Sequence, residues 1–84
     1  MKIGLTQRIL HYNNTAYDCL EHGWYNLLSG HTLFCIPNII DQDYKKIVSD
    51  LDMVIFTGGD ASPHRILVET KVLTQCYIQD KPVL

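Results

Sequence analysis

The chain has 84 residues, which is the size of one small domain. Hydrophobic residues make up 46% of it, as in globular proteins and unlike disordered ones. The net charge of −2 and the pI near 6.0 give no basic field, so we expect neither nucleic acid nor an anionic membrane as a partner. No long apolar run follows Met1, and we therefore expect no signal peptide and no membrane span.

The cysteines indicate a reducing environment. The chain has three, an odd number, at wide spacing and without a Cys-x-x-Cys pair. This pattern argues against a disulfide framework or a structural zinc site and favours a cytoplasmic location. The four histidines show no mutual metal-ligand spacing, and no metal or cofactor is predicted. Three residues are expected to act as small buried hydrophobes rather than nucleophiles, because each lies inside a predicted helix or strand: Cys19, Cys35 and Cys76.

The first half of the chain predicts one strand and one helix. A short apolar run indicates a strand over residues 2–6, and a polar loop follows over residues 7–14, in which Asn13 and Asn14 are typical turn residues. Apolar residues at helical spacing then predict a helix over residues 15–29. Thr15 and Asp18 give this helix a start that resembles a capping box, and Gly30 stands where a helix C-cap is common. Its predicted apolar face consists of Tyr17, Leu20, Trp24, Leu27 and Leu28.

The second half predicts alternating strands and helices. Strands are expected over residues 32–36 and 53–57, and the second of these is continuously apolar, as a strand covered on both faces should be. Acidic residues precede a short helix over residues 42–49. The pair 62–63 is a serine followed by a proline, which predicts the start of another helix. Residues 82–84 read as the opening of a fourth strand.

This alternation predicts an α/β fold. We expect a partial doubly wound, flavodoxin-like parallel sheet of about four strands with flanking helices, forming one incomplete domain over residues 1–84. Sheets of this kind hold their functional sites at the carboxyl ends of the strands. The first three ends fall at residues 6–8, 36–38 and 57–60, and the fourth is expected after Leu84.

Gly58 and Gly59 are the most informative residues of the sequence. Two glycines after a buried strand allow a sharp turn and leave backbone N–H groups able to face an oxyanion or a phosphate. A tight turn without any ligand is the simpler alternative and remains open. Asp60 either accepts a hydrogen bond from a ligand or caps its own turn, and the cap is preferred.

Two other groups of polar residues are candidates. Thr6, Gln7 and Arg8 end the first strand, and Arg8 is either a carboxylate or phosphate ligand or a solvated loop residue. Arg65 and Glu69 are four residues apart on one predicted helix, where a solvated surface pair is the preferred interpretation.

The segment 50–60, DLDMVIFTGGD, resembles the part of class I glutamine amidotransferases that carries one half of the oxyanion hole. The closest branch is the γ-glutamyl hydrolases grouped as C26 peptidases, in which a helix with an arginine and a glutamate precedes a strand containing proline. Arg65, Glu69 and the segment 81–84, KPVL, follow that progression. Ile66 departs from it, because aspartate often follows the arginine in relatives.

The beginning of the chain is similar as well. The segments IGLTQR at 3–8 and WYNLL at 24–28 resemble hydrolases of γ-glutamyl-CDP-amidate. The resemblance spans essentially all 84 residues and about the first third of a family domain, which usually has ~200–250 residues.

The resemblance implies a cysteine-dependent hydrolase of γ-glutamyl amide bonds. The backbone N–H of Gly59 would stabilise the oxyanion, Gly58 would allow the turn, and Thr6, Gln7 and Arg8 would line the substrate entrance. The family's Cys, His and Glu triad has no counterpart here, so the 84 residues alone are expected to be inactive. Two alternatives remain open: a non-enzymatic α/β module that is a remnant, is completed by another chain or self-associates at its open sheet edge, and a small phosphate or nucleotide binder at Gly58 and Gly59.

Overall fold

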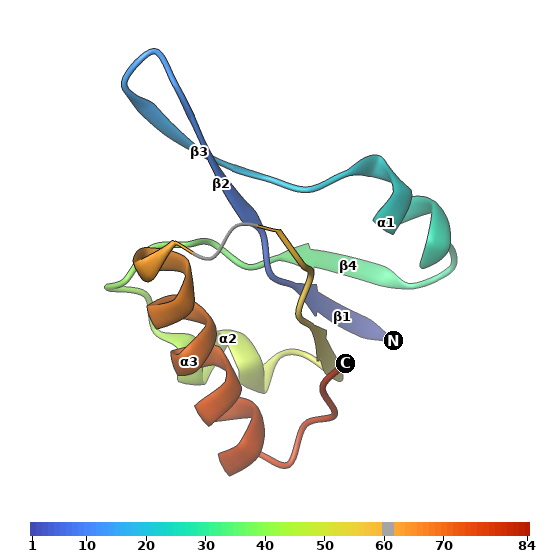
Figure 1. Ribbon diagram of the computed structural model, residues 1–84. Helices are drawn as coiled ribbons and strands as arrows, with labels where there is room; N and C mark the ends of the chain where they lie inside the picture. Colours follow the sequence, from blue (N-terminus) through green and yellow to red (C-terminus); the bar gives the residue numbers. More distant parts are fainter. Residues whose placement is uncertain (60–61) are drawn as a thin grey trace.

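The computed structural model describes residues 1–59 and 62–84, and Figure 1 shows their arrangement. Strands and helices alternate along the chain after an initial hairpin. The elements are β1 (Lys2–Leu5), β2 (Arg8–Tyr12), β3 (Thr15–Cys19), α1 (His22–Leu27), β4 (Thr32–Cys35), α2 (Tyr44–Ser49), β5 (Met53–Ile55) and α3 (Pro63–Ile78).

The core of the molecule is a three-stranded parallel sheet with the order β4–β1–β5. Ile3 in the middle strand lies opposite Leu33 on one side and Met53 on the other. The three strands therefore lie where the sequence predicts them. The expected fourth strand is present only as a single parallel bridge between Val54 and Val83, and the N–H of Leu84 donates to the carbonyl of Val54 at 3.0 Å.

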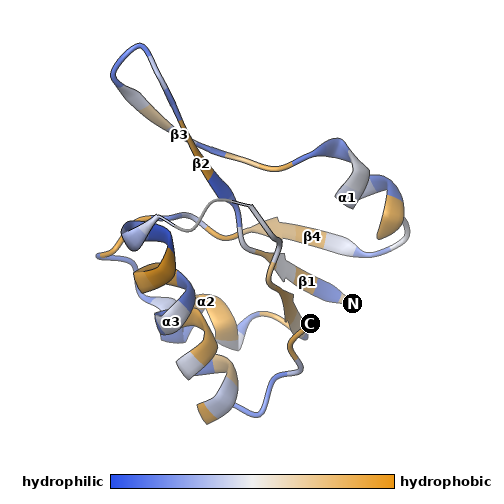
Figure 2. Cartoon of the chain, in the orientation of Figure 1, coloured by the Kyte–Doolittle hydropathy of each residue, from blue (hydrophilic) through white to orange (hydrophobic). Residues whose placement is uncertain are grey.

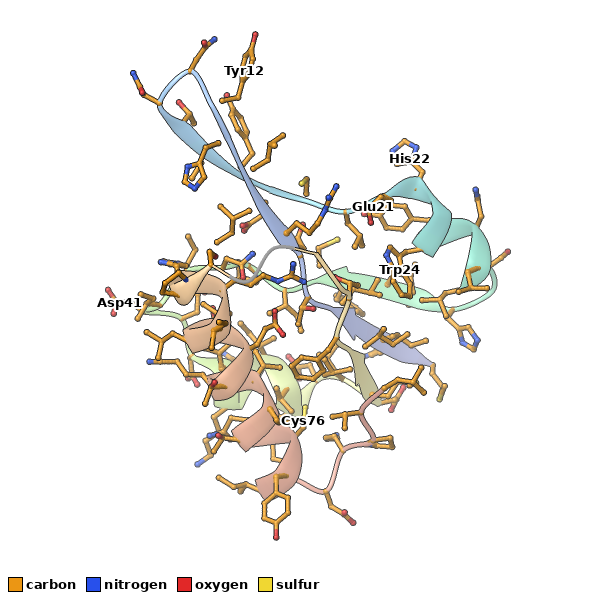
Figure 3. The ribbon with its side chains drawn as sticks, viewed as in Figure 1. Tyr12, Glu21, His22, Trp24, Asp41 and Cys76 are labelled. Atoms are coloured by element: carbon orange, nitrogen blue, oxygen red, sulfur yellow. The ribbon has the colours of Figure 1, made fainter. Side chains whose placement is uncertain are left out.

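Helices cover both faces of this sheet. On one face, α2 and α3 pack together over the strands. Cys76 of α3 points inward, toward the core formed by these helices and the sheet (Figure 3). On the other face, Trp24 of α1 packs on Ile3 and Leu5, together with Leu20 and Leu28. The larger cluster consists of Ile36, Tyr44, Val48, Leu51, Val54, Val68, Val72 and Cys76. The continuously apolar strands are explained by this two-sided cover.

The first half of the chain differs from its prediction. Residues 8–12, expected in a polar loop, form β2, and residues 15–19, expected in a helix, form β3. The two strands pair antiparallel across a two-residue turn, with Tyr12 opposite Thr15. Asn13 and Asn14 have φ values of 49° and 60°, as a type I′ turn requires, so the expectation that they are turn residues is confirmed. Cross-strand pairing then outweighs the helical spacing of the segment that follows.

The predicted helix over residues 15–29 is therefore mostly wrong. Only His22–Leu27 is helical, and Thr15 is a strand residue rather than a helix cap. Leu27, expected on the apolar face, is 75% exposed, and Tyr17 is exposed on the hairpin. The helical spacing holds for Leu20, Trp24 and Leu28, which do pack on the sheet.

The other two helices begin at side-chain caps. Asp43 caps α2 by accepting a hydrogen bond from the N–H of Lys46 at 3.1 Å, and the helix begins two residues later than expected. Ser62 caps α3 by accepting from the N–H of Arg65 at 3.2 Å, and Pro63 follows at the first helical position. The prediction of a helix start at residues 62–63 is confirmed.

The outer side of α3 carries exposed apolar side chains. Ile66, Leu73 and Tyr77 are exposed on this helix. The far end of the hairpin, by contrast, is coloured as hydrophilic in Figure 2. Among the helices that the structure describes, none combines the length and apolar character needed to cross a membrane.

Cys76 gives a direct test of this packing, because it is buried against the sheet whereas Cys35 is exposed. Burial raises the pKa of the Cys76 thiol, and the nearby Lys81 offsets this only in part. Since the thiolate is the reactive form, we expect iodoacetamide to modify Cys35 readily and Cys76 at least ~10³-fold more slowly, at the rate of global opening. Mass spectrometry of timed samples measures both rates, and rates within tenfold of each other would contradict the packing.

Candidate functional site

The carboxyl ends of the three parallel strands are tied together by buried polar groups. After β1 and β5, the hydroxyl of Thr6 accepts from the N–H of Thr57 at 2.9 Å, and the hydroxyl of Thr57 donates to the carbonyl of Thr6 at 2.7 Å. After β1 and β4, the side chain of Gln7 donates to the carbonyl of Ile36 at 2.9 Å, and the side chain of Asn38 donates to the carbonyl of Gln7 at 2.9 Å. These bonds hold the loops that follow the strands in fixed positions.

The turn after β5 has a backbone conformation that favours glycine. Gly59 has φ of +138°, and a Cβ at this position would touch the Cδ of Arg8 and lie 2.8 Å from the Nη1 of Arg65. At Gly58, a Cβ would meet nothing within 4 Å among the described residues. The requirement for glycine in this turn therefore lies at Gly59.

The guanidinium of Arg65 donates hydrogen bonds to the residues of this turn. Its side chain is 1% exposed, and its Nη2 donates to the carbonyl of Thr57 at 2.5 Å and to the hydroxyl of Thr57 at 3.1 Å. Its Nη1 donates to the carbonyl of Gly58 at 3.3 Å, and its Nε lies 2.6 Å from a carboxylate oxygen of Glu69. The expectation of a solvated Arg65–Glu69 surface pair is wrong, because the arginine is needed as a donor to the carbonyls of the turn.

The position of Arg65 also fixes the direction of the Gly59 N–H. In a trans peptide the carbonyl and the following N–H point in opposite directions, and the described part of the chain has no cis peptide bond. Because the carbonyl of Gly58 points toward the guanidinium of Arg65, the N–H of Gly59 points away from it. The turn thus presents a backbone donor on the side opposite Arg65.

Arg8 lies against the same turn. A Cβ at Gly59 would also be 2.6 Å from the Cγ of Arg8, so the stem of this arginine covers the glycine. Its guanidinium lies 2.5 Å from a carboxylate oxygen of Glu21, and about half of each side chain is exposed. Glu21 is the N-cap residue of α1 but makes no capping hydrogen bond with its side chain. A positive and a negative group therefore stand side by side next to the turn.

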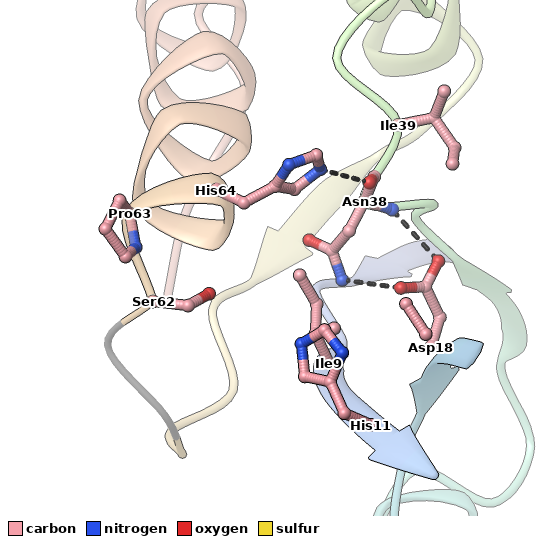
Figure 4. Close-up of a pocket in the computed structure, with 9 residues that line it drawn as sticks. Ile9, His11, Asp18, Asn38, Ile39, Ser62, Pro63 and His64 are labelled. Atoms are coloured by element: carbon pink, nitrogen blue, oxygen red, sulfur yellow. Dashed lines mark hydrogen bonds between the residues drawn. The ribbon is translucent and has the colours of Figure 1, made fainter. Parts of the chain in front are cut away.

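A pocket of about 350 Å³ lies between the hairpin, the end of β4 and the first turn of α3 (Figure 4). One face of the hairpin forms a wall of it, because the cross-strand pairs Ile9 with Asp18 and His11 with Ala16 point the same way. The pocket is lined by Ile9, His11, Ala16, Asp18, Asn38, Ile39, Ser62, Pro63 and His64.

Asn38 organises the polar side of this pocket. Its backbone N–H donates to one carboxylate oxygen of Asp18, and its side-chain amide donates to the other, both at 3.0 Å. His64 Nε2 lies 2.6 Å from the carbonyl of Asn38, and since a carbonyl only accepts, Nε2 carries the proton. Figure 4 shows these three residues converging from β3, the loop after β4 and α3. The hairpin is thereby fastened to the sheet.

Tyr44 supports the loop that holds Asn38, because its buried hydroxyl lies 2.7 Å from the carbonyl of Pro37 and 2.6 Å from that of Ile39. We expect Tyr44→Phe to lower the free energy of unfolding by about 1–2 kcal/mol at pH 7, since the hydroxyl is the donor to buried carbonyls. Urea denaturation measures this cost.

The cost of Tyr44→Phe should also depend on pH. Burial raises the pKa of Tyr44, so the unfolded chain ionises first as the pH rises above 10. The contribution of the hydroxyl is therefore complete below pH 10 and is lost above it. The difference between wild type and variant should shrink between pH 7 and pH 11, and a constant difference would contradict this reading.

The predicted site residues differ in burial and in the contacts that they make. Thr6 and Gln7 are buried, and their side chains are used in the bonds between strand ends. Arg8 is exposed beside Gly59. Asp60 lies outside the described residues.

Three residues of the site were missed by sequence reasoning. Asn38 lies within the strand end predicted at residues 36–38, which is a signal that could have singled it out. His64 lies in the first turn of a helix whose start was predicted. Asp18 had no usable signal, because it was assigned to a helix rather than to the hairpin.

No cluster of three or more His, Cys, Asp or Glu side chains suited to a metal ion occurs within residues 1–59 and 62–84. No family model, curated protein or solved structure matches the chain.

Proposed function

We propose that residues 1–84 form the N-terminal part of a class I glutamine amidotransferase-like domain that hydrolyses γ-glutamyl amide bonds, and that they supply one half of its oxyanion hole. The observation that carries the proposal is the turn at Gly59. Its N–H points away from Arg65, at the carboxyl end of a parallel strand, where sheets of this class hold their sites.

The strand order supports this assignment. In chain order the parallel segments are β1, β4, β5 and residues 82–84, and in space they follow the order second, first, third, fourth. This is the beginning of the flavodoxin-like doubly wound order. Helices on both faces, with α1 on one and α2 and α3 on the other, agree with it.

The register of residues 82–84 supports the position that the proposal gives to the nucleophile. The N–H of Phe56 donates to the carbonyl of Leu84 at 2.9 Å, so a chain that continued parallel to β5 would pass beside Gly58 and Gly59. In the family that the sequence resembles, a cysteine elbow follows this strand. The proposal therefore assigns the nucleophile to a segment outside these 84 residues.

The proposed reaction has two steps, formation of a thioester and its hydrolysis. A cysteine thiolate attacks the γ-glutamyl carbonyl carbon, and the N–H of Gly59 stabilises the negative charge that forms on the carbonyl oxygen. The C–N bond then breaks, the amine leaves with a proton from a general acid, and a thioester remains. Water attacks the thioester and releases glutamate and the thiol.

Arg8 and Glu21 suit the glutamyl part of such a substrate. Its α-carbon is three bonds of about 1.5 Å from the carbonyl carbon and carries a carboxylate and an ammonium group. The guanidinium of Arg8 could bind the carboxylate, and the carboxylate of Glu21 could bind the ammonium. An exposed ion pair is worth only about 0–1 kcal/mol, so a ligand that rearranges it loses little stabilisation.

A titration of the ¹⁵N-labelled 84-residue chain with L-glutamine tests the proposal. We expect the Gly59 and Arg8 amide resonances to shift, with a dissociation constant of about 1–10 mM, and we expect no turnover because the chain lacks the nucleophile. Arg8→Gln should weaken binding, whereas Lys71→Gln on the exposed side of α3 should not. Unchanged Gly59 and Arg8 resonances at saturating glutamine, or turnover by the purified chain, would contradict the proposal.

A second candidate function is a module that pairs with another chain. The backbone groups of Pro82 and Leu84 bond to β5, so those of the intervening Val83 point to the open side of the sheet. The exposed Leu73 and Tyr77 lie near this edge and line a groove with Val83. An edge of this kind favours strand addition or self-association. Light scattering after size exclusion separates a monomer from an assembly, and a monomer at about 100 µM would argue against self-association at this edge.

A further inference from the structure

The pocket beneath the hairpin is lined by residues that lie close along the chain to the glycine turn and to Arg8, which contacts that turn. Arg8 covers Gly59 with its stem, and the next residue, Ile9, lines the pocket. On the other side, Ser62 and His64 line the pocket shortly after the turn along the chain. A substrate whose carbonyl lies at Gly59 would therefore have a preformed space next to it.

The walls of this pocket favour an uncharged group. Ile9, Ala16, Ile39 and Pro63 supply apolar surface. Both carboxylate oxygens of Asp18 already accept hydrogen bonds from Asn38. The Nε2 proton of His64 is likewise directed to the carbonyl of Asn38. Asp18, Asn38 and His64 thus bond to one another, and the apolar surface remains for a ligand.

The size of the pocket favours a ligand larger than ammonia. Its volume of about 350 Å³ falls at the lower end of the range for small-molecule sites, which is about 300–1,000 Å³. Ammonia, the product of glutamine hydrolysis, would leave nearly all of this space empty. A single aromatic or heteroaromatic ring with its substituents fits the lower end of the range.

We propose that this pocket is the subsite for the amine portion of the γ-glutamyl amide, and that it takes an uncharged, ring-bearing amine substituent. The inference rests on the proposed function, in which the carbonyl at Gly59 divides the substrate into two parts. The glutamyl part lies toward Arg8 and Glu21, and the ring lies between the hairpin and α3. The substrate class is then γ-glutamyl derivatives of ring-bearing amines rather than glutamine.

Two probes compared by NMR on the 84-residue chain test the inference. We expect γ-L-glutamyl-p-nitroanilide to bind at least tenfold more tightly than L-glutamine, because only the anilide places a ring in the pocket. The anilide should shift the methyl resonances of Ile9, Ala16 and Ile39. Both probes should shift the amide resonances of Gly59 and Arg8.

A matched pair of variants on the hairpin isolates the pocket. Ala16→Leu fills the pocket with three further carbon atoms and should weaken anilide binding at least tenfold while leaving glutamine binding unchanged. Thr15→Leu, the neighbouring position, does not line the pocket and should change neither affinity. Far-UV circular dichroism confirms that both variants fold.

The outcomes separate this inference from the proposed function. Equal affinity for the two probes, or equal losses in Ala16→Leu and Thr15→Leu, would overturn the inference while shifts at Gly59 and Arg8 keep the proposed function standing. Absence of shifts at Gly59 and Arg8 with both probes would overturn the proposed function and the inference together.

Discussion

Replacing Arg65 by methionine is expected to lower the free energy of unfolding by about 3–5 kcal/mol. Methionine keeps most of the apolar stem but removes the donors to the carbonyl and hydroxyl of Thr57 and to the carbonyl of Gly58. A buried acceptor without a partner costs about 1–3 kcal/mol. Glu69 also loses its ion pair, although its partial exposure lets water replace part of that contact.

Two variants on the same helix serve as controls for Arg65→Met. Lys71→Met removes a positive charge from an exposed position and should change stability by no more than about 0.5 kcal/mol. Glu69→Gln keeps an acceptor near the Nε of Arg65 and should cost less than about 1 kcal/mol. Urea denaturation followed by circular dichroism measures all three. A cost below 1 kcal/mol for Arg65→Met would show that the turn does not depend on this side chain.

The size of this effect matters because the chain is short. At about 0.05–0.15 kcal/mol per residue, 84 residues have a total stability of about 4–13 kcal/mol. The loss of Arg65 would remove a large share of it. One side chain therefore links the stability of the whole fold to the conformation of the turn at Gly58 and Gly59.

The parallel sheet could be predicted from the sequence because its signals are local. The strand at residues 53–55 is a run of apolar residues, and Ser62 and Pro63 mark the start of α3 by cap chemistry alone. The fourth strand was predicted from the same kind of signal. It is only a bridge at Val83, because pairing with β5 involves two or three residues.

The hairpin could not be predicted from hydrophobic pattern, because neither of its faces is buried in the core. Leu10 and Tyr17 are exposed on one side, and His11 and Ala16 are exposed on the other. The sequence signal was the pair Asn13 and Asn14, whose tolerance of positive φ sets the turn. Recognising the turn without the strands on either side led to the wrong helix.

The proximity of two strand ends could be predicted from the sequence, whereas the side-chain contacts there could not. Gly59 and Arg8 do lie together, as strand ends in one sheet should. The burial of Arg65 was missed, because spacing of four from Glu69 is the usual pattern of a surface pair. The burial of Arg65 depends on the direction in which the carbonyls of Thr57 and Gly58 point. That direction in turn depends on where the end of β5 lies relative to the start of α3.

Gly59→Ala is expected to lower the free energy of unfolding by about 1–3 kcal/mol and to impair the oxyanion donor. A φ of +138° is strained for alanine, and the added Cβ would meet the buried Nη1 of Arg65, which cannot move without breaking its bond to Gly58. The flexible stem of Arg8 can move aside. Relief of this strain would turn the peptide between residues 58 and 59, so the N–H that the proposal assigns to the oxyanion would change direction.

Gly58→Ala is the matched control for this turn, because a Cβ there meets no described atom within 4 Å. We expect it to change stability by at most about 0.5 kcal/mol and to leave the glutamine-induced shift of the Gly59 amide in place, whereas Gly59→Ala should abolish the corresponding shift. In a complete enzyme, loss of one such donor lowers kcat about 10²–10³-fold. Equal effects of the two substitutions on stability and on the titration would mean that the turn only closes a loop. A selective effect at position 59 would tie the backbone conformation of this turn to the N–H that the proposal assigns to the oxyanion.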